Sequence, residues 1–348
     1  MAMVRKESFG KTADGREASL YTIINANGME IALCDFGAAL VSVKLPNGDG
    51  TKTDVVLGYD DVTGYENDTS CIGATVGRVC NRIGNAAFTL NGKNYKLDAN
   101  DGVNSLHSGF TSLSKKFYTA QVLDNEMAVA FSIMSPSMEQ GFPGDLDAKV
   151  TFTLTENNEL QIHYEAVSSE DTLCNFTNHS YFNLAGHDAG SVLDHELVLE
   201  SRKYTPTDAG LIPTGEIRDV LGTPFDFTGA KALGRDIDAD DQGLKYALGY
   251  DVNFIIDHRT SEPEMCAKLF DAASKRTMCV YTSAPCVQVY TANHMDLVEG
   301  KCGAKYRFRG SVCLETQFAP DAINHPEFAQ PILRKGDKFD STTIFAFS

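Results

Sequence analysis

The chain has 348 residues, of which 43% are apolar and 22% are charged, a composition typical of a soluble globular protein with a large core. Its formal net charge of -17 disfavours nucleic acid, anionic membranes and highly phosphorylated ligands, because binding to phosphates requires basic surface. The acidity fits a neutral ligand such as a sugar, and solubility alone also accounts for it.

Nine cysteines are scattered from Cys34 to Cys313 without C-x-x-C spacing. This pattern favours free thiols in a reducing compartment over a zinc site or a disulfide framework. The first ten residues, M-A-M-V-R-K-E-S-F-G, contain no apolar run typical of a signal peptide. No stretch reaches the ~18 apolar residues of a transmembrane helix. We therefore expect a cytoplasmic protein.

Alternating apolar and polar residues predict strands along most of the chain. The pattern predicts strands within residues 30–45 and at 55–57. Residues 86–97 carry the clearest hairpin signal, because Asn91-Gly92 separates two alternating runs. Residues 148–167 predict a second hairpin. Further strands are expected at 279–282, 287–291 and 311–316.

Helical patterns are scarce, and 29 glycines and 11 prolines mark many turns. Many short strands with few short helices predict an all-β antiparallel sandwich or barrel. No proline-rich or Gly/Ser linker and no repeat of fixed period divides the chain. We therefore expect a single domain over residues 1–348, since composition does not support a split near residue 170.

The stretch N-F-T-N-H-S-Y-F-N-L-A-G, residues 175–186, contains one histidine, His179, and no charged residue. A histidine among strands is more often structural than catalytic. Here three asparagines offer hydrogen bonds without charge, and no carboxylate in the stretch would hold the imidazole as a cation. We therefore expect a pKa near neutrality, which suits a general acid.

Glu315 and His107 are two further candidates. Glu315 ends the alternating run S-V-C-L-E, where it either faces water, as is usual, or lies in a site. Partial desolvation in a site would raise its pKa and make it a usable base. His107 lies between Gly102 and Gly109, which predicts either a ligand-binding loop or an exposed loop histidine.

Four polar residues in other apolar runs complete the set. Asp251 precedes the apolar run V-N-F-I-I, and Gln288 alternates with two valines and so faces away from them. Arg82 follows Asn81, four residues after Arg78. Each arginine is either an edge charge or a hydrogen-bonding fork for ligand hydroxyls.

Several catalytic motifs are missing from the sequence. It has no G-x-G-x-x-G after a strand, no Walker loop, no H-E-x-x-H and no G-x-S-x-G. Dinucleotide redox chemistry, phosphoryl transfer, zinc hydrolysis and serine hydrolysis are therefore disfavoured. The remaining imidazoles, carboxylates, amides and arginine suit proton transfer on a neutral polyhydroxylated molecule.

Nine stretches together resemble the aldose 1-epimerases, the galactose mutarotases, and they occur in that family's order over nearly the whole chain. They are V-G-R-V-C-N-R-I-G-N-A-A-F-T-L-N-G-K-N-Y-K-L, N-S-L-H-S-G, Q-G-F-P-G-D-L, N-F-T-N-H-S-Y-F-N-L-A-G, P-T-D-A-G-L-I-P-T-G, P-F-D-F, G-Y-D-V-N-F, V-Q-V-Y-T-A-N and L-E-T-Q-F-A-P-D-A-I-N-H-P-E-F. Each stretch alone is a weak signal, whereas the ordered set is highly specific.

The resemblance implies a large antiparallel β-supersandwich that binds a sugar in an open cleft across one sheet. It implies interconversion of the α and β anomers of galactose, and usually of glucose, without a cofactor or a metal. By motif, Glu315 corresponds to the general base and His179 to the general acid. The residues expected to hold the sugar hydroxyls and the ring oxygen are His107, Asp251, Arg82, Asn81 and Gln288.

Ring opening requires one base and one acid. We expect an ionised Glu315 and a protonated His179 near pH 7, one on each side of the sugar ring. The sequence departs from the family pattern at Ser108, where glycine is usual, at Val252, where histidine is usual, and in having no tryptophan. These changes are expected to touch the cleft rim and to affect substrate preference.

Three other functions remain open. A glycoside hydrolase would use two carboxylates, for which Glu315 and Asp251 are available. A non-catalytic sugar-binding sandwich would not need both His179 and Glu315. A hexose-phosphate epimerase would need a basic cluster for the phosphate, which the sequence does not show. The expected partner is a monosaccharide, bound by a monomer or a weak homodimer.

Overall fold

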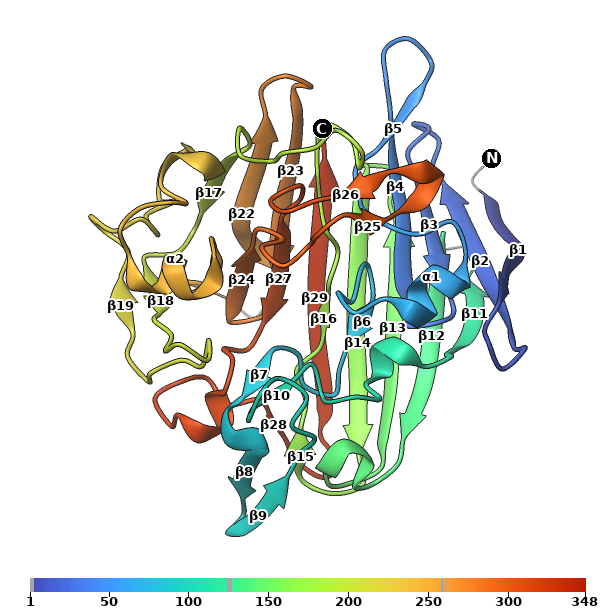
Figure 1. The fold of residues 1–348 in the computed structure, drawn as a ribbon. Coiled ribbons are helices and arrows are strands. Elements are labelled where there is room, and N and C mark those ends of the chain that lie inside the picture. The colour runs from blue at the N-terminus through green and yellow to red at the C-terminus, as the bar shows by residue number, and fades with distance from the viewer. Residues whose placement is uncertain (1–2, 124–126, 258–259, 261) are drawn as a thin grey trace.

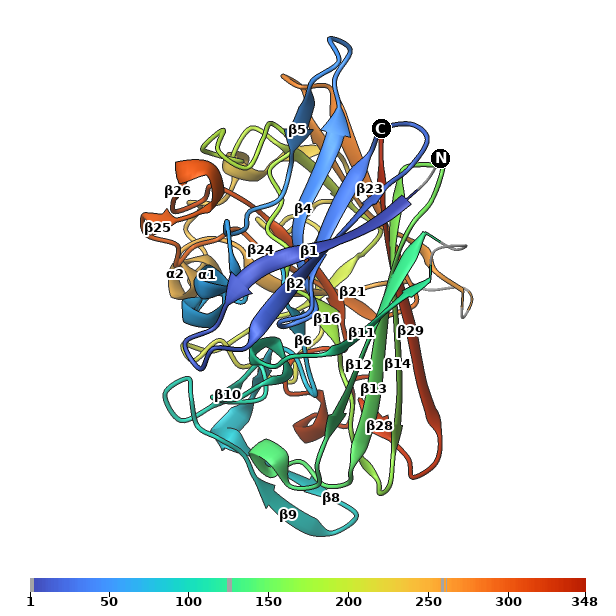
Figure 2. The same ribbon diagram turned by 90° about the vertical axis from the view of Figure 1, so that its right-hand side faces the viewer.

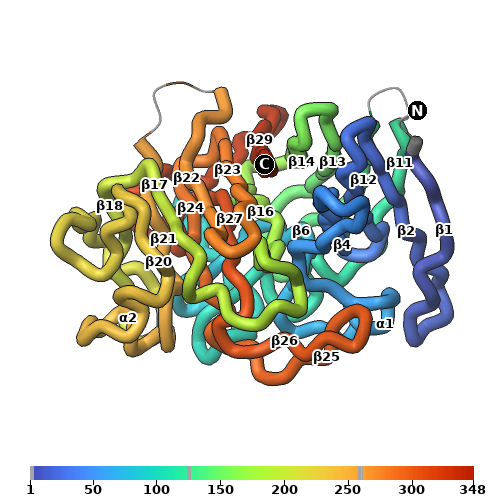
Figure 3. The backbone as a smooth tube through the Cα atoms, turned by 90° about the horizontal axis from the view of Figure 1, so that it is seen from above, coloured from blue at the N-terminus to red at the C-terminus, as the bar shows by residue number. Residues whose placement is uncertain are grey.

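The structure is a computed structural model that describes residues 3–123, 127–257, 260 and 262–348. Its strands pair antiparallel throughout the named sheets, so the expected fold class is confirmed. Figure 2 shows β13, β14 and β29 side by side along one side of the molecule, with the two short helices on the opposite side. Figure 3 shows the same layering from above.

The largest sheet has nine strands and forms one wall of the molecule (Figure 1). In spatial order they are β11 (Thr119–Leu123), β12 (Ala128–Ser135), β13 (Leu146–Leu154), β14 (Glu159–Ser168), β29 (Lys338–Phe347), β23 (Arg276–Thr282), β22 (Glu264–Asp271), β17 (Glu196–Leu199) and β20 (Lys231–Ala232). Side chains of β13 and β14 alternate between buried and more exposed positions, so one face of this wall covers the core.

Two five-stranded sheets pack against the nine-stranded sheet. The N-terminal one contains β1 (Met3–Lys11), β2 (Glu17–Ile24), β3 (Glu30–Cys34), β4 (Ala39–Pro46) and β5 (Lys52–Asp54). The other contains β19 (Arg218–Asp219), β18 (Lys203–Thr205), β21 (Asp251–Ile255), β24 (Cys286–Tyr290) and β27 (Cys313–Gln317). One buried apolar cluster draws residues from all three sheets, among them Ile31, Phe152 and Val289.

Short strand pairs and turns connect these sheets. The pairs are β6 (Thr75–Val76) with β16 (Thr177–Asn178), β7 (Arg82–Ile83) with β10 (Ser105–Leu106), β8 (Ala87–Leu90) with β9 (Lys93–Lys96), β15 (Thr172–Leu173) with β28 (Ile332–Leu333), and β25 (Val298–Glu299) with β26 (Lys305–Tyr306). The α-helices are α1 (Val62–Asn67) and α2 (Gln242–Ala247), and the 3-10 helices are η1 (Gly84–Ala86), η2 (Leu113–Lys115), η4 (Glu139–Gly141), η5 (Leu233–Arg235), η6 (Lys301–Gly303) and η7 (Ala322–Asn324).

Both predicted hairpins are present. Asn91 and Gly92 join β8 to β9 with φ values of 51° and 74°, and positive φ at both central residues is the signature of the expected tight turn. The second hairpin joins β13 to β14. No helix among the described residues is long and apolar enough to cross a membrane.

The predicted strand at 55–57 is wrong. The strand β5 ends at Asp54, and Val56 forms only an isolated bridge with Phe182. The N–H of Val55 donates to Val43, whereas the N–H of Leu57 donates to Tyr181. The backbone thus changes partners here as it crosses from the N-terminal sheet to the site region, and its apolar side chains are buried without belonging to a regular strand.

Candidate active site

Three neighbouring strands, β21, β24 and β27, present polar side chains on one face and apolar side chains on the other. Asp251, Gln288 and Glu315 lie on the polar face, where Gln288 is directly opposite Glu315 in the ladder. The apolar face packs into the main core through Val252, Val289 and Leu314. This period of two brings the carboxylates and amide together, since adjacent strands are about 4.8 Å apart.

His179 follows β16, and the short pair of β6 with β16 fixes its backbone. Its N–H donates to the carbonyl of Ala74 at 2.9 Å. The imidazole is 5% exposed and stacks on the ring of Tyr181, with 4.9 Å between centroids. The edge-to-face contact with His107 has a centroid separation of 5.3 Å. Aromatic packing therefore fixes the plane of this ring.

The asparagines around His179 do not hydrogen-bond its ring, contrary to the expectation from the sequence. The side chain of Asn178 donates to the carbonyl of Gly73, and that of Asn183 donates to the carbonyls of Gly190 and Gly310. Asn175 pairs with the backbone of Phe318. These amides join separate segments of backbone and so build the wall that carries the imidazole.

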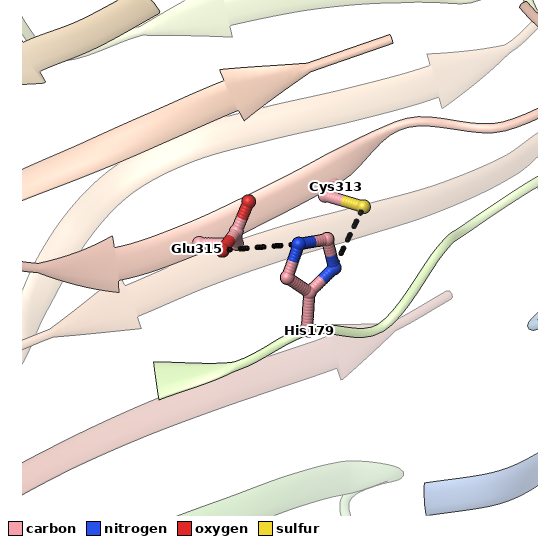
Figure 4. A group of neighbouring side chains, drawn as sticks. All are labelled: His179, Cys313 and Glu315. Atoms are coloured by element: carbon pink, nitrogen blue, oxygen red, sulfur yellow. Dashed lines mark hydrogen bonds and ion pairs between the residues drawn. The ribbon is translucent and has the colours of Figure 1, made fainter. Parts of the chain in front are cut away.

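The ring nitrogens of His179 instead meet two side chains of β27 (Figure 4). Nε2 lies 3.5 Å from Oε2 of Glu315, and Nδ1 lies 3.6 Å from Sγ of Cys313. Glu315 is 3% exposed, and Oε2 has no hydrogen-bond partner among the described residues. An imidazole and a carboxyl group are thus in contact in a buried setting, where each is able to exchange protons.

Burial changes the proton affinity of both members of this pair. It raises the pKa of Glu315 well above its usual value, and the nearby Asp251 adds to that rise while Arg82 opposes it. Burial lowers the pKa of His179 to about 4, so the expected value near neutrality is wrong. These directions favour a neutral carboxyl group beside a neutral imidazole, whereas the sequence suggested an ionised Glu315 and a protonated His179.

Two hydrogen bonds join His107 and Asn81. The N–H of His107 donates to the carbonyl of Asn81 at 3.0 Å, and the N–H of Asn81 donates to Nδ1 of His107 at 3.1 Å. Burial lowers the pKa of His107 well below its usual value. Its neutral ring therefore carries its proton on Nε2, which is left to act as a hydrogen-bond donor.

Asp251 is held from two sides. Nε2 of Gln288 donates to Oδ1 of Asp251 at 2.5 Å, and a guanidinium nitrogen of Arg82 lies 3.6 Å from Oδ2. Arg82 also donates from Nε to Asp101 at 2.8 Å. Arg82 is therefore already paired with two carboxylates, which together offset its positive charge.

These groups surround a cavity of about 170 Å³. Six of the seven residues predicted from the sequence line it, whereas Gln288 is buried behind Asp251 and does not. The sequence did not single out the other lining residues, which are Thr69, Ser70, Cys71, Leu106, Tyr181, Tyr290 and His294. Tyr181 and Tyr290 lie two positions after His179 and Gln288, so strand periodicity was the available signal for them.

The described part of the chain has larger hollows elsewhere. One of about 710 Å³ lies on the nine-stranded sheet between residues such as Met134, Lys149 and Lys338. This larger hollow does not contain the buried imidazole–carboxyl pair. We therefore assign the active site to the smaller cavity, which does. Arg78, the other arginine considered, is fully buried and donates to Ser135 and to backbone carbonyls, so it supports the fold and does not reach this cavity.

Two departures from the family pattern do not touch the cavity rim, contrary to expectation. The hydroxyl of Ser108 accepts from the N–H of Val79 at 2.8 Å and donates to its carbonyl at 2.9 Å. Val252 faces the core, on the opposite side of β21 from Asp251, and lines a separate hollow. Ser108 therefore acts on the site through the backbone next to His107, and Val252 acts through packing.

His179, Cys313 and Glu315 place possible metal ligands within 4.8 Å of one another. Imidazole, thiolate and carboxylate are zinc ligand types. The two residues of β27, however, meet different nitrogens of the ring (Figure 4). Because the lone pairs of these nitrogens diverge, one ion does not bind all three side chains in the arrangement observed.

Comparison with known proteins gives a consistent result. A family model described as aldose 1-epimerase matches residues 19–346. Galactose mutarotases from Bos taurus and Homo sapiens are each 40% identical to this chain, with alignments that cover 100% of it and 99% of each relative. The aldose 1-epimerase of Escherichia coli K12 is 35% identical, over 96% of both chains.

Solved structures agree with the sequence relatives. A GalM/aldose epimerase homologue from C. elegans has a TM-score of 0.87 and 30% identity, covering 100% of this chain and 99% of its own. A galactose 1-epimerase from Lactobacillus acidophilus also has a TM-score of 0.87, with 25% identity and the same coverage. The matched fold, the length of the match and the sequence identity together place this chain in the aldose 1-epimerase family.

Proposed function

We propose that this enzyme interconverts the α and β anomers of free hexoses such as galactose and glucose, with Glu315 as the general base and His179 as the general acid. The observation that carries the assignment of roles is the contact of 3.5 Å between Nε2 of His179 and Oε2 of Glu315 at this cavity. Family membership supports the reaction and a monosaccharide substrate.

The reaction needs only proton transfers and a bond rotation. Glu315 accepts the proton of the anomeric hydroxyl, and Nε2 of His179 donates a proton to the ring oxygen. The bond between C1 and the ring oxygen breaks, which leaves an open-chain aldehyde. Rotation about C1–C2 presents the other face of the carbonyl, and ring closure returns both protons. Each catalytic group typically contributes ~10²–10⁴-fold to the rate.

The side-by-side placement of acid and base suits this chemistry better than the opposed placement expected from the sequence. The anomeric oxygen and the ring oxygen are bonded to the same carbon. Two groups that serve them must therefore reach adjacent atoms, and His179 and Glu315 are 3.5 Å apart. A sugar held with C1 against this pair has both reacting oxygens within reach, and fixed geometry lowers the barrier further.

The protonation states of Glu315 and His179 are compatible with these roles. A neutral carboxyl group with a neutral imidazole holds the same number of protons as a carboxylate with an imidazolium. Donation from the anomeric hydroxyl stabilises the carboxylate form of Glu315. Substrate binding thus favours transfer of the carboxyl proton to His179, and the working form is created when the sugar arrives.

The remaining lining residues hold the sugar. Nε2–H of His107, the amide of Asn81 and the guanidinium of Arg82 are the proposed donors, and Asp251 is the proposed acceptor. Gln288 contributes by holding Asp251. Among the described lining residues there is one arginine, already paired with carboxylates, and no lysine, which favours a neutral sugar over a sugar phosphate.

We also propose that the chain is a single domain that acts in the cytoplasm as a monomer or a weak homodimer. The shared core of the three large sheets supports a single domain. All nine cysteines are free thiols, which supports a reducing compartment.

Polarimetry of freshly dissolved α-galactose, α-glucose and α-xylose tests the function. The protein should accelerate the approach to the equilibrium rotation, and Glu315→Gln and His179→Asn should each reduce the rate by ~10²–10⁴-fold while folding normally. Either variant running near the wild-type rate refutes its assigned role. Cleavage of an aryl galactoside would favour a hydrolase, and sugar binding without accelerated mutarotation would favour a binding protein.

A further inference from the structure

Strand β27 contacts both nitrogens of one imidazole. Cys313 and Glu315 are two residues apart, so their side chains lie on the same face of the strand. Sγ of Cys313 reaches Nδ1 of His179 at 3.6 Å, and the carboxyl group reaches Nε2 at 3.5 Å. Figure 4 shows the ring between these two side chains. Cys313 does not line the sugar cavity, so it meets only the far side of the ring.

We propose that Cys313 is a positioning residue for this reaction, whose sulfur accepts a hydrogen bond from Nδ1–H of His179 and thereby presents Nε2 to the sugar. This inference rests on the proposed role of His179 as the acid. In the working imidazolium, Nδ1–H points to the sulfur and Nε2–H points to the ring oxygen. After proton donation, the neutral ring keeps its proton on Nδ1, and Nε2 is free to take the transferred proton back.

The neutrality of the sulfur is the second part of the proposal. Cys313 is fully buried, and burial beside Glu315 raises the pKa of its thiol well above the usual value. The group therefore remains an uncharged thiol, which is a weak acceptor. A carboxylate at this position would stabilise the imidazolium, as the aspartate of a Ser-His-Asp triad does. A thiol orients the ring without that effect, so the imidazolium remains a strong enough acid to protonate a sugar ring oxygen.

The other groups around the imidazole do not supply this anchor. Tyr181 stacks on the face of the ring, and the rings of His107 and Tyr290 approach it edge-on. Glu315 occupies the Nε2 side. Among the described residues, Cys313 is the one whose side chain is in hydrogen-bonding contact with Nδ1.

The test compares three substitutions of one residue. Cys313→Ala removes the acceptor, Cys313→Asn supplies a neutral oxygen acceptor, and Cys313→Asp supplies a charged acceptor of the same shape. Cys266→Ala is the matched control, because Cys266 is also fully buried in a strand but lies in the nine-stranded sheet away from the site. Thermal melting of all four variants checks that each is folded.

Kinetics should separate positioning from binding. Cys313→Ala is expected to lower kcat about 10-fold, the effect of losing one oriented hydrogen bond, with little change in KM. Cys313→Asn should recover most of this loss, and Cys266→Ala should retain the wild-type kcat. An unchanged kcat in Cys313→Ala, or an equal loss in the control, overturns the proposal.

Nitrogen NMR of histidine-labelled protein gives a readout that a purely structural role would not change. The His179 signals are assigned by their absence from His179→Asn. Wild-type neutral His179 should carry its proton on Nδ1, and Cys313→Ala should lose that preference. Cys313→Asp should raise the pKa of His179 by at least about 1 unit relative to Cys313→Asn.

The wild-type spectrum alone can refute the proposal. A neutral wild-type ring protonated on Nε2 excludes the inferred hydrogen bond. These spectra do not depend on turnover. A wild-type protein that fails to accelerate mutarotation therefore refutes the proposed function, separately from the result on the tautomer.

Discussion

Removal of the Ser108 hydroxyl should destabilise the protein at a position next to the site. The hydroxyl bonds both the N–H and the carbonyl of Val79, at 2.8 and 2.9 Å, and both residues are buried. Ser108→Ala leaves two buried backbone groups without this partner. Each unsatisfied group costs ~1–3 kcal/mol, so we expect the two to lower the free energy of unfolding by about 2 to 6 kcal/mol.

A second variant separates the hydrogen bonds from the backbone strain. Ser108 has a φ of 68°, which costs alanine about as much as serine but costs glycine nothing. Ser108→Gly should therefore be about 1 kcal/mol more stable than Ser108→Ala, while still less stable than the wild type. His107 precedes this residue, so both variants should also raise KM for the sugar.

Equilibrium urea denaturation followed by fluorescence measures these differences, and a substitution of the exposed Ser191 to alanine is the control. A Ser108→Ala variant within ~0.5 kcal/mol of the wild type would refute the assignment of these two hydrogen bonds. A glycine variant less stable than the alanine variant would refute the account of backbone strain.

Three further predictions concern the buried polar groups. Gln288→Leu should raise KM about 10-fold with a smaller effect on kcat in initial-rate assays, because Asp251 loses its hydrogen bond from Nε2 of Gln288; an unchanged KM would contradict this positioning role. In urea titrations at pH 7 without sugar, Glu315→Gln should be more stable than the wild type, because a carboxyl group whose pKa is raised in the folded state destabilises that state as pH rises above its unfolded pKa; lower stability would contradict the burial argument. The imidazole of His179 has the opposite pH dependence, because its pKa falls from 6.5 to about 4 on folding. The free energy of unfolding of the wild type should therefore drop by about 3 kcal/mol relative to that of His179→Asn as pH falls from 6.5 to 4. Parallel curves of stability against pH for the two proteins would refute this lowered pKa.

Local sequence patterns predicted the parts of the fold that depend on neighbouring residues. Alternation and the Asn91-Gly92 turn identified both hairpins, because strand pairing and turn conformation are encoded within a few residues. Residues 55–57 were predicted wrongly as a strand, because that prediction also used only local sequence. Their apolar character reflects burial between two sheets, and burial alone does not distinguish a paired strand from a crossing segment.

The composition of the site could be anticipated, but its electrostatics could not. The ordered family motifs predicted His179 and Glu315 as a catalytic pair, and the two side chains are in contact in the structure. The depth of burial and the influence of Asp251 on Glu315 arise only from tertiary packing, so the pKa directions were not accessible. The role of Ser108 depends likewise on Val79, a residue far away along the chain.

The strict alternation of β21, β24 and β27 has a consequence for how this site tolerates change. Val252 and Leu314 face the core, while their neighbours Asp251 and Glu315 line the cavity. Insertion or deletion of a single residue within one of these strands would exchange the two faces downstream, which would place a carboxyl group in the apolar interior and a valine in the sugar cavity. Length variation compatible with catalysis is therefore confined to the connections between these strands, whatever substitutions the strands themselves accept.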